Sequence, residues 1–76
     1  MNTIEAINFQ HVERLKLTGD TTVFVGFVSG ASRTFEFSDS ARAASMVLAF
    51  ENWCDTRHRY GGYVVSIGED GKARAR

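Results

Sequence analysis

The chain has 76 residues, of which 43% are hydrophobic and 24% are charged, and its nine basic side chains balance nine acidic ones. This length holds a single domain, residues 1–76, and the balanced charge argues against both an acidic mimic of nucleic acid and a strongly basic nucleic-acid binder. One cysteine excludes an internal disulfide, and no apolar run approaches the roughly 20 residues of a membrane span. We therefore expect a soluble, cytoplasmic protein that does not contact membranes.

The first ten residues fit two patterns. Ile7 and Phe9 alternate with polar neighbours, as in a strand, whereas a second set of apolar residues has helical spacing (Ile4, Ile7, Val12 and Leu15). We expect a strand or extended segment that continues into the first hairpin, with a helix as the alternative.

Two glycines predict the turns of a three-stranded antiparallel meander. A two-residue Gly19-Asp20 loop has glycine first, as a type II′ turn requires, and a Gly30-Ala31 loop repeats the pattern. Directly opposed residues share a face of a sheet. One face should therefore collect Leu15, Leu17, Phe24, Gly26, Phe35 and Phe37. The other should collect Arg14, Lys16, Val23, Val25, Phe27, Thr34 and Glu36.

The middle segment, Thr21 to Ser29, is apolar at almost every position. A strand with one face in water should alternate, so we predict a central strand that is at least partly covered on both sides. Gly26 is expected to make room for the ring of Phe35 on the neighbouring strand, with a β-bulge as the alternative.

The stretch SDSARAASMVLAFENWCDTRHRY predicts a helix that begins after an N-cap at Ser38 and runs to roughly Arg57. Asp39 in the first turn suits the positive end of the helix dipole. An apolar stripe about 120° wide should pack on the sheet face that holds Phe24 and Phe35. The stripe comprises Ala43, Met46, Val47, Phe50, Trp53 and Cys54.

After the helix, we expect a strand from Tyr63 to Ile67 and a turn at Glu69-Asp70-Gly71. A helical crossover should make this strand parallel to the third one. The end from Lys72 to Arg76 is either a frayed return strand or a free tail. The sequence thus predicts an α+β fold, with an antiparallel meander, one amphipathic helix on one face and a further strand after the helix.

No residue pattern indicates catalysis or a cofactor. Cys54 and His58 lie one helical turn apart, but a structural zinc site needs four ligands, and Cys54 falls on the predicted core stripe. We expect a buried, inert thiol. The glycine-containing stretches GFVSGAS and GGYVVSIG do not match a phosphate-binding loop. We therefore expect a protein that is not an enzyme and uses no metal or cofactor.

Two surfaces are candidates for binding a partner. Val23, Val25 and Phe27 would form an apolar row bordered by Arg14 and Lys16, which suits a partner protein or a second copy of the chain. The alternative is that the N-terminal segment covers this row (Ile4, Ile7 and Phe9). The second surface is the basic C-terminal third, which could contact nucleic acid or simply be a solvated helix end and tail. It comprises Arg57, Arg59, Tyr60, Lys72, Arg74 and Arg76.

The order of three strands, a helix and a further strand resembles part of the double-stranded-RNA-binding domain. The hairpins and the stretch SDSARAASMVLAF lie where the sheet and second helix of that family would be. The second helix of that family opens with a lysine-rich phosphate-binding motif, whereas this chain has SARAAS there, with Arg42 as its only cation. The resemblance is to topology alone.

The short length, the turns TGD and EDGKARAR, and one amphipathic helix on a small sheet form a second pattern. In these features the whole chain is similar to small, cofactorless proteins encoded by phages of Gram-negative bacteria, among them the anti-CRISPR proteins. The resemblance implies a non-enzymatic inhibitor that occupies the surface of a host protein complex, such as a CRISPR–Cas effector. It assigns no functional residue, because anti-CRISPR proteins share no sequence signature.

Overall fold

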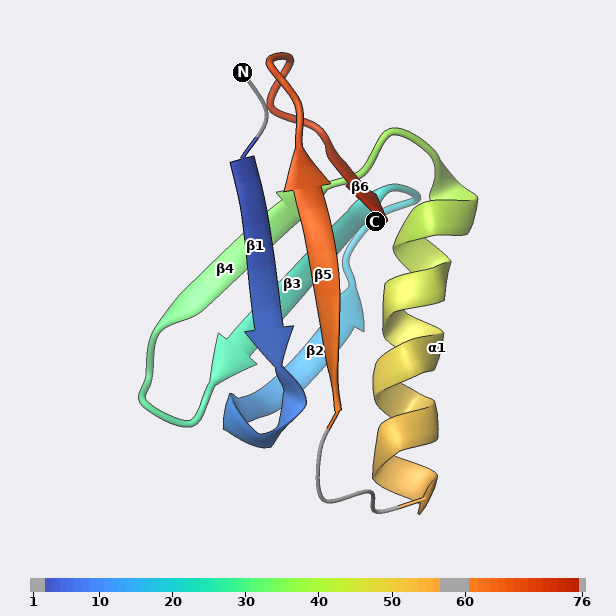
Figure 1. Ribbon diagram of the computed structural model, residues 1–76. Helices are drawn as coiled ribbons and strands as arrows, with labels where there is room; N and C mark the ends of the chain where they lie inside the picture. The colour runs from blue at the N-terminus through green and yellow to red at the C-terminus, as the bar shows by residue number, and fades with distance from the viewer. Residues whose placement is uncertain (1–2, 57–60, 76) are drawn as a thin grey trace.

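A computed structural model, described over residues 3–56 and 61–75, arranges the chain as two antiparallel sheets beside one helix (Figure 1). One sheet has the strand order β2-β3-β4, with bounds Val12–Leu17, Thr22–Phe27 and Ser32–Glu36. The other has the order β1-β5-β6, with bounds Thr3–Asn8, Gly62–Ile67 and Ala73–Ala75. The helix α1 spans Ser40–Thr56. The predicted α+β class, with strands before and after a single helix, is confirmed.

The N-terminal segment is a strand, as predicted, but it belongs to a different sheet from the hairpin that follows. A short 3-10 helix, η1 (Phe9–His11), turns the chain between β1 and β2. The Asn8 side chain caps this turn by accepting a hydrogen bond from the Gln10 N–H at 3.0 Å. The turn allows β1 to lie over the inner face of the β2-β3-β4 sheet, with β5 beside it (Figure 1).

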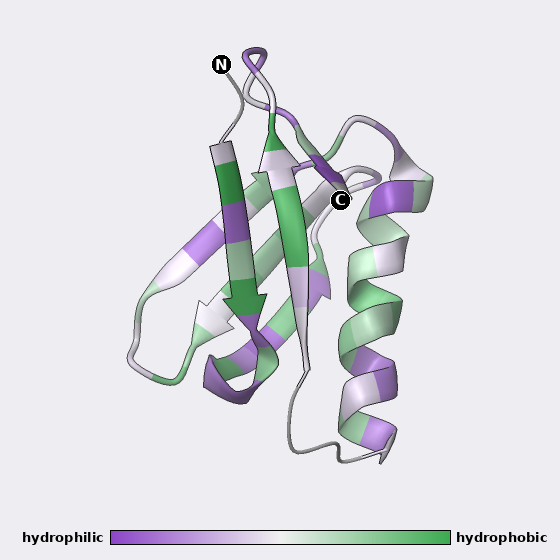
Figure 2. Ribbon diagram, in the orientation of Figure 1, coloured by the Kyte–Doolittle hydropathy of each residue, from purple (hydrophilic) through white to green (hydrophobic). Residues whose placement is uncertain are grey.

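The core lies between the two sheets and the helix. Every strand and helix contributes at least one buried apolar side chain, and no polar or charged residue of the described chain is buried. Figure 2 shows the hydrophobic stretches of β1, β5 and the middle of α1 that meet there. The buried residues are Ile7, Phe9, Val12, Leu15, Val23, Val25, Phe35, Phe37, Ala43, Met46, Val65 and Ala73.

The first hairpin differs from the prediction by one residue. Leu17 lies opposite Val23 and Lys16 opposite Phe24, because the loop contains three residues, Gly19 to Thr21, rather than two. The Thr18 N–H closes this loop by donating to the Thr22 carbonyl at 2.9 Å. Side chains alternate along a strand, so a slip of one residue exchanges the two faces.

The second hairpin differs by three residues. Val25 lies opposite Arg33 and Val23 opposite Phe35, and the loop runs from Val28 to Gly30. The Gly30 N–H donates to the Phe27 carbonyl at 2.9 Å, and Gly30 has a φ of 95°. This geometry is that of a three-residue hairpin loop in which glycine takes the left-handed position at the end. Three is also an odd number, so this shift in register likewise moves each side chain of the central strand to the opposite face of the sheet. The two hairpins therefore agree on which face each residue of β3 occupies.

The predicted faces of the central strand are therefore wrong. Val23 and Val25 point inward and are fully buried, whereas Phe24 points outward with Lys16 and Thr34 as its cross-strand neighbours. Gly26 does not accommodate Phe35. A bulge exists, but it lies in β2, between Val12 and Arg14.

The helix is capped one residue later than predicted. Asp39, not Ser38, accepts the hydrogen bond from the Arg42 N–H at 2.8 Å. Ala43 and Met46 of the predicted stripe are buried, and three more members pack partly buried against the core (Val47, Phe50 and Trp53).

The prediction of a buried Cys54 is wrong, because its thiol is exposed. Phe50 and Trp53 make the apolar contacts at this end of the helix by packing around Phe9, with ring centroids 5.3 and 5.9 Å from the Phe9 ring. Cys54 falls outside that cluster. The predicted helix end at Arg57 and the residue His58 lie outside the described residues.

The strand after the helix pairs differently from the prediction. β5 runs antiparallel to β1, with Ile7 opposite Tyr63, instead of parallel to the third strand, because β1 supplies the partner. The turn at Glu69 to Gly71 is present, and the return strand β6 pairs with β5. An isolated parallel bridge between Phe37 and Ala73 then connects the two sheets.

Candidate functional site

The apolar row predicted as a binding surface is part of the core. Val23 and Val25 are fully buried and Phe27 is half-buried, so the prediction of an exposed row is wrong. The alternative, in which the N-terminal segment covers the row, is confirmed for Ile7 and Phe9, which are both buried. Arg14 and Lys16, predicted as its border, lie exposed on the opposite face of the sheet.

The basic C-terminal surface is only partly described. Arg57, Arg59, Tyr60 and Arg76 lie outside the described residues. The backbone N–H of Lys72 donates to Asp70 at 3.0 Å, and Arg74 forms an ion pair with Asp70 at 3.4 Å. The hydrogen bond from Lys72, followed by the charge of Arg74, holds the pKa of Asp70 below its ordinary value.

Lys72 also lies near a second carboxylate, that of Glu36. The hydroxyl groups of Thr22 and Thr21 donate to Glu36 at 2.6 and 2.7 Å and lower its pKa, with a smaller contribution from the charge of Lys72. The described cations of this surface are thus locally balanced by ionised acids.

The free edge of β1 is a feature that the sequence reasoning missed. β1 stands at the end of the order β1-β5-β6, so it has a partner strand on one side only. The Phe9 N–H donates to the Gly61 carbonyl at 2.9 Å, and backbone groups alternate in direction along an antiparallel strand. The N–H and C=O groups of Ile4, Ala6 and Asn8 therefore point away from β5, toward the unpaired edge.

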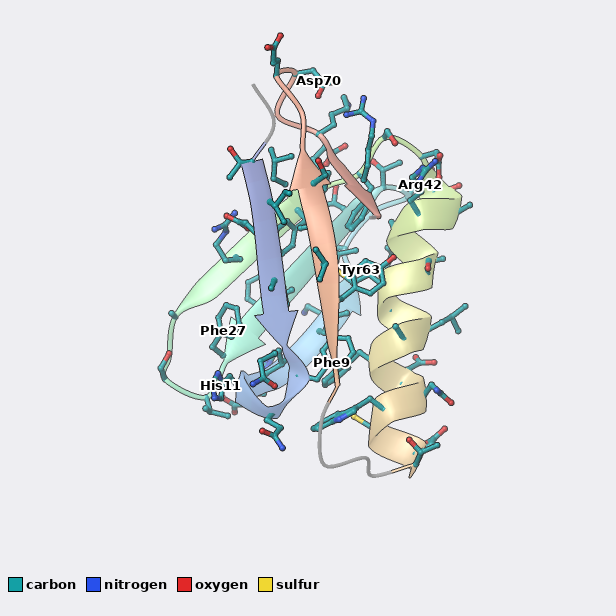
Figure 3. All side chains as sticks on the ribbon, viewed as in Figure 1. Phe9, His11, Phe27, Arg42, Tyr63 and Asp70 are labelled. Atoms are coloured by element: carbon teal, nitrogen blue, oxygen red, sulfur yellow. The ribbon has the colours of Figure 1, made fainter. Side chains whose placement is uncertain are left out.

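A hollow of about 390 Å³ lies along this edge. Figure 3 shows Phe27 and His11 on the side of β1 that faces away from β5. The β3–β4 loop extends past β1 there (Figure 1), and Val28 in that loop is 65% exposed. The residues around the hollow are Ala6, Ile7, Asn8, His11, Phe27, Val28 and Ser29.

The outer face of the β1-β5-β6 sheet is also apolar. Ile4 is 53% exposed and Val64 is 41% exposed, and a second hollow, of about 430 Å³, includes Val64 and Tyr63. Residues 6–8 border both hollows. Gly62 keeps β5 close to β1 here, because a Cβ at this position would collide with the Ile7 carbonyl oxygen.

One ion pair ties β1 to the sheet beneath it. Arg33 of β4 contacts the Glu5 Oε1 at 2.7 Å, and Oε2 of the same carboxylate is buried and accepts no hydrogen bond from the described residues. The inward-facing charge of β1 is thus neutralised, while one of its acceptor oxygens stays open.

The described residues hold no cluster of side chains that could form a metal centre. Over residues 3–56 and 61–75, no group of three or more His, Cys, Asp or Glu side chains could hold a metal ion. Within the same ranges, no helix has the length and hydropathy required to cross a membrane.

Comparison with known proteins gives no relative from which a function could be transferred. No family model matches the chain, and no curated protein or solved structure matches it significantly. The functional assignment therefore depends on the geometry of the chain itself.

Proposed function

We propose that this chain is a non-enzymatic protein-binding module that accepts an extended segment of a partner as an additional strand beside β1. One observation carries the proposal: the unpaired edge of β1 borders an apolar hollow whose floor is the end of β3 and the β3–β4 loop. A fourth strand of the β1-β5-β6 sheet would lie over this hollow.

The backbone of β1 offers the hydrogen bonds that strand addition requires. The outward N–H and C=O groups of Ile4 and Ala6 have no partner within the described chain. In strand addition, such main-chain bonds supply affinity, and alternate side chains of the incoming strand supply specificity. One set of those side chains would point into the hollow, against Phe27 and Val28, so an apolar residue is favoured there.

The edge carries few of the features that usually prevent strand pairing. Natural edge strands are often protected by lysine, proline, a bulge or an inward-pointing charge, and of these β1 has only the charge of Glu5, which Arg33 neutralises. The outward-pointing side chains of β1 belong to Ile4, Ala6 and Asn8, and the Glu5 charge points inward to Arg33. A donor side chain on the incoming strand could also satisfy the open oxygen of Glu5.

The predicted partner, a host protein complex such as a CRISPR–Cas effector, follows from the phage-protein resemblance and stays a prediction. The geometry adds what such a partner must present: an extended segment with an unpaired backbone. A second copy of the chain is the other occupant that could supply one.

The test uses peptides of about ten residues selected from a displayed random library. A bound peptide should slow hydrogen exchange of the Ile4 and Ala6 amides, and Ala6→Pro should weaken binding by at least about tenfold. The fold should tolerate this proline because the Ala6 N–H points away from β5. Selected peptides that leave both amides unprotected, or that bind the proline variant normally, would contradict the proposal.

A matched pair of charge substitutions tests the hollow. Val28→Glu should reduce binding because it places a charge beside the incoming apolar side chain. Leu48→Glu is the control, since Leu48 is 62% exposed on α1, away from the hollow.

Light scattering tests whether a second copy of the chain is the occupant. A mass of 8.4 kDa at all concentrations removes the homodimer, whereas doubling that Ala6→Pro reverses would make a second copy the occupant.

A further inference from the structure

The outer face of the β2-β3-β4 sheet points away from β1 and β5 and carries a second cluster of side chains. The register places one row from each strand on this face. Most of the row is exposed, and only Thr22, Phe24 and Gly26 of the central strand are half-buried. The face comprises Arg14, Lys16, Thr22, Phe24, Gly26, Ser32, Thr34 and Glu36.

Phe24 lies at the centre of this face, where the hydrophobic core does not require it. Lys16 and Thr34 lie opposite it on the two neighbouring strands, and Lys16 Nζ is 6.0 Å from the ring centroid. Gly26 leaves space beside the ring, since a Cβ there would lie 3.4 Å from the Phe24 ring and 3.1 Å from Arg14 Cγ. The ring and the Arg14 stem thus form a low apolar patch between two cationic groups.

The two cations of this patch have no carboxylate partner in the described chain. Arg33, Arg42 and Arg74 each form an ion pair, with Glu5, Asp39 and Asp70. Arg14 and Lys16 form none, and both flank the same ring. Glu36 is the one carboxylate among the paired residues of this face, and its oxygens accept hydrogen bonds from Thr21 and Thr22 at the far end of the strand.

We infer that this face binds single-stranded nucleic acid, with one base stacked on Phe24 and neighbouring phosphates held by Arg14 and Lys16. An aromatic ring between cations on an open sheet matches the alternation of base and phosphate along a single strand. Arg14 and Lys16 lie two residues apart, which is roughly 7 Å along a strand, so each can hold a separate phosphate. A duplex fits less well because its bases are stacked on each other and not free to cover the ring.

This site differs from the basic C-terminal surface considered from the sequence and from the edge of β1. The described C-terminal cations lie beside ionised acids, and β1 lies on the other side of the β2-β3-β4 sheet. Ala6→Pro should therefore leave oligonucleotide binding unchanged, which separates the failure of one proposal from the failure of the other.

The first test measures fluorescence anisotropy of a labelled oligothymidylate of about twelve nucleotides. Binding should weaken as salt rises from about 50 to about 200 mM, with a logarithmic slope near −1.4 for two neutralised phosphates. A duplex of the same length should bind more weakly. The inference is overturned if the single strand does not bind at low salt or if the duplex binds more tightly.

Single substitutions locate the contact. Phe24→Leu keeps an apolar cover over Gly26 but removes the ring, and it should weaken binding at least about fivefold. Arg14→Gln and Lys16→Gln should each reduce the salt slope by about 0.7. Glu36→Gln should strengthen binding because it removes a negative charge from the face.

Arg42→Gln is the matched control, since it removes one positive charge from a side chain already paired on the helix. It should leave binding unchanged, and thermal unfolding of each variant confirms that the fold is retained. An equal loss on Arg42→Gln, or no loss on Phe24→Leu, would overturn the inference. Displacement of the oligonucleotide by an equal concentration of polyglutamate would also overturn it, because the face would then select acidic chains without using the ring.

Discussion

The two sheets are equal in strand number but differ in how the chain assembles them. The β2-β3-β4 sheet joins consecutive segments through short loops, whereas β1-β5-β6 brings together strands from both sides of the helix. The first sheet exposes a broad polar face around Phe24, and the second exposes a narrow edge beside a hollow. In this domain, local hairpins therefore form a sheet with an open polar face, and long-range pairing leaves β1 with an unpaired edge.

The largest expected effect is a difference in stability loss between substitutions on the two faces of the β2-β3-β4 sheet. Phe35→Ala empties a site that is 2% exposed and should reduce the free energy of unfolding by about 3–5 kcal/mol. Phe24→Ala, on the outer face, should cost no more than about 2 kcal/mol. Urea unfolding measures both, and equal losses would mean that the two rings share one environment.

A smaller effect compares one glycine from each sheet. Gly62→Ala forces a Cβ against the Ile7 backbone and should destabilise the β1–β5 pair by about 1–3 kcal/mol. Gly26→Ala meets the Arg14 side chain instead, which can shift, and should change stability by less than about 0.5 kcal/mol. If Gly62→Ala left the free energy of unfolding unchanged, β1 and β5 would have to lie farther apart at this position than the contact between Gly62 and Ile7 implies.

The ion pair between the sheets should have a modest effect. In a double-mutant cycle with Glu5→Gln and Arg33→Gln, the coupling should be about 0.2–1 kcal/mol, since the side chains are 25% and 48% exposed. The Asp70–Arg74 pair, which is longer at 3.4 Å and lies within one hairpin, should couple less. A larger coupling at Asp70–Arg74 would contradict the idea that Glu5–Arg33 fastens one sheet to the other.

The smallest effect concerns pH. The pKa of Glu36 in the folded chain lies below its ordinary value near 4.5, because of the two threonine hydroxyls. The unfolded chain then binds more protons in that range, so the contribution of Glu36 is present above pH 4.5 and is lost as pH falls through the lowered pKa. Glu36→Gln should flatten this acid-side loss in urea titrations. An unchanged pH profile would remove Glu36 as its source.

The sequence predicts the elements of this fold better than their registers. The order of the meander, the helix and the C-terminal turn all follow from glycine positions and apolar spacing. Gly30, however, fits either the first position of a two-residue loop or the last of a three-residue loop, since both favour a positive φ. The hydrogen bond from the Phe27 N–H to the Ala31 carbonyl shows that the loop has three residues. The predicted registers of both hairpins differ from the observed ones by an odd number of residues. The two predictions therefore agreed with each other, although both placed the side chains of the central strand on the wrong faces.

A stronger signal was available in the side chains themselves. One face of the central strand carries three large apolar side chains, those of Val23, Val25 and Phe27. The other face of that strand includes Gly26, which has no side chain. The face with more apolar side chains is the one expected to face the core. The β1–β5 pairing had no comparable local signal, because it joins segments more than fifty residues apart. The free edge, and with it the proposed binding site, depends on that distant pairing.

The contact between Gly61 and Trp53 has a practical consequence. A Cβ at Gly61 would collide with the indole, whose Nε1 is buried without a hydrogen-bond partner in the described chain. Because the chain contains a single tryptophan, its emission reports directly on whether the end of the helix stays docked against the start of the fifth strand. Native fluorescence can thus follow that junction during titrations without any attached dye.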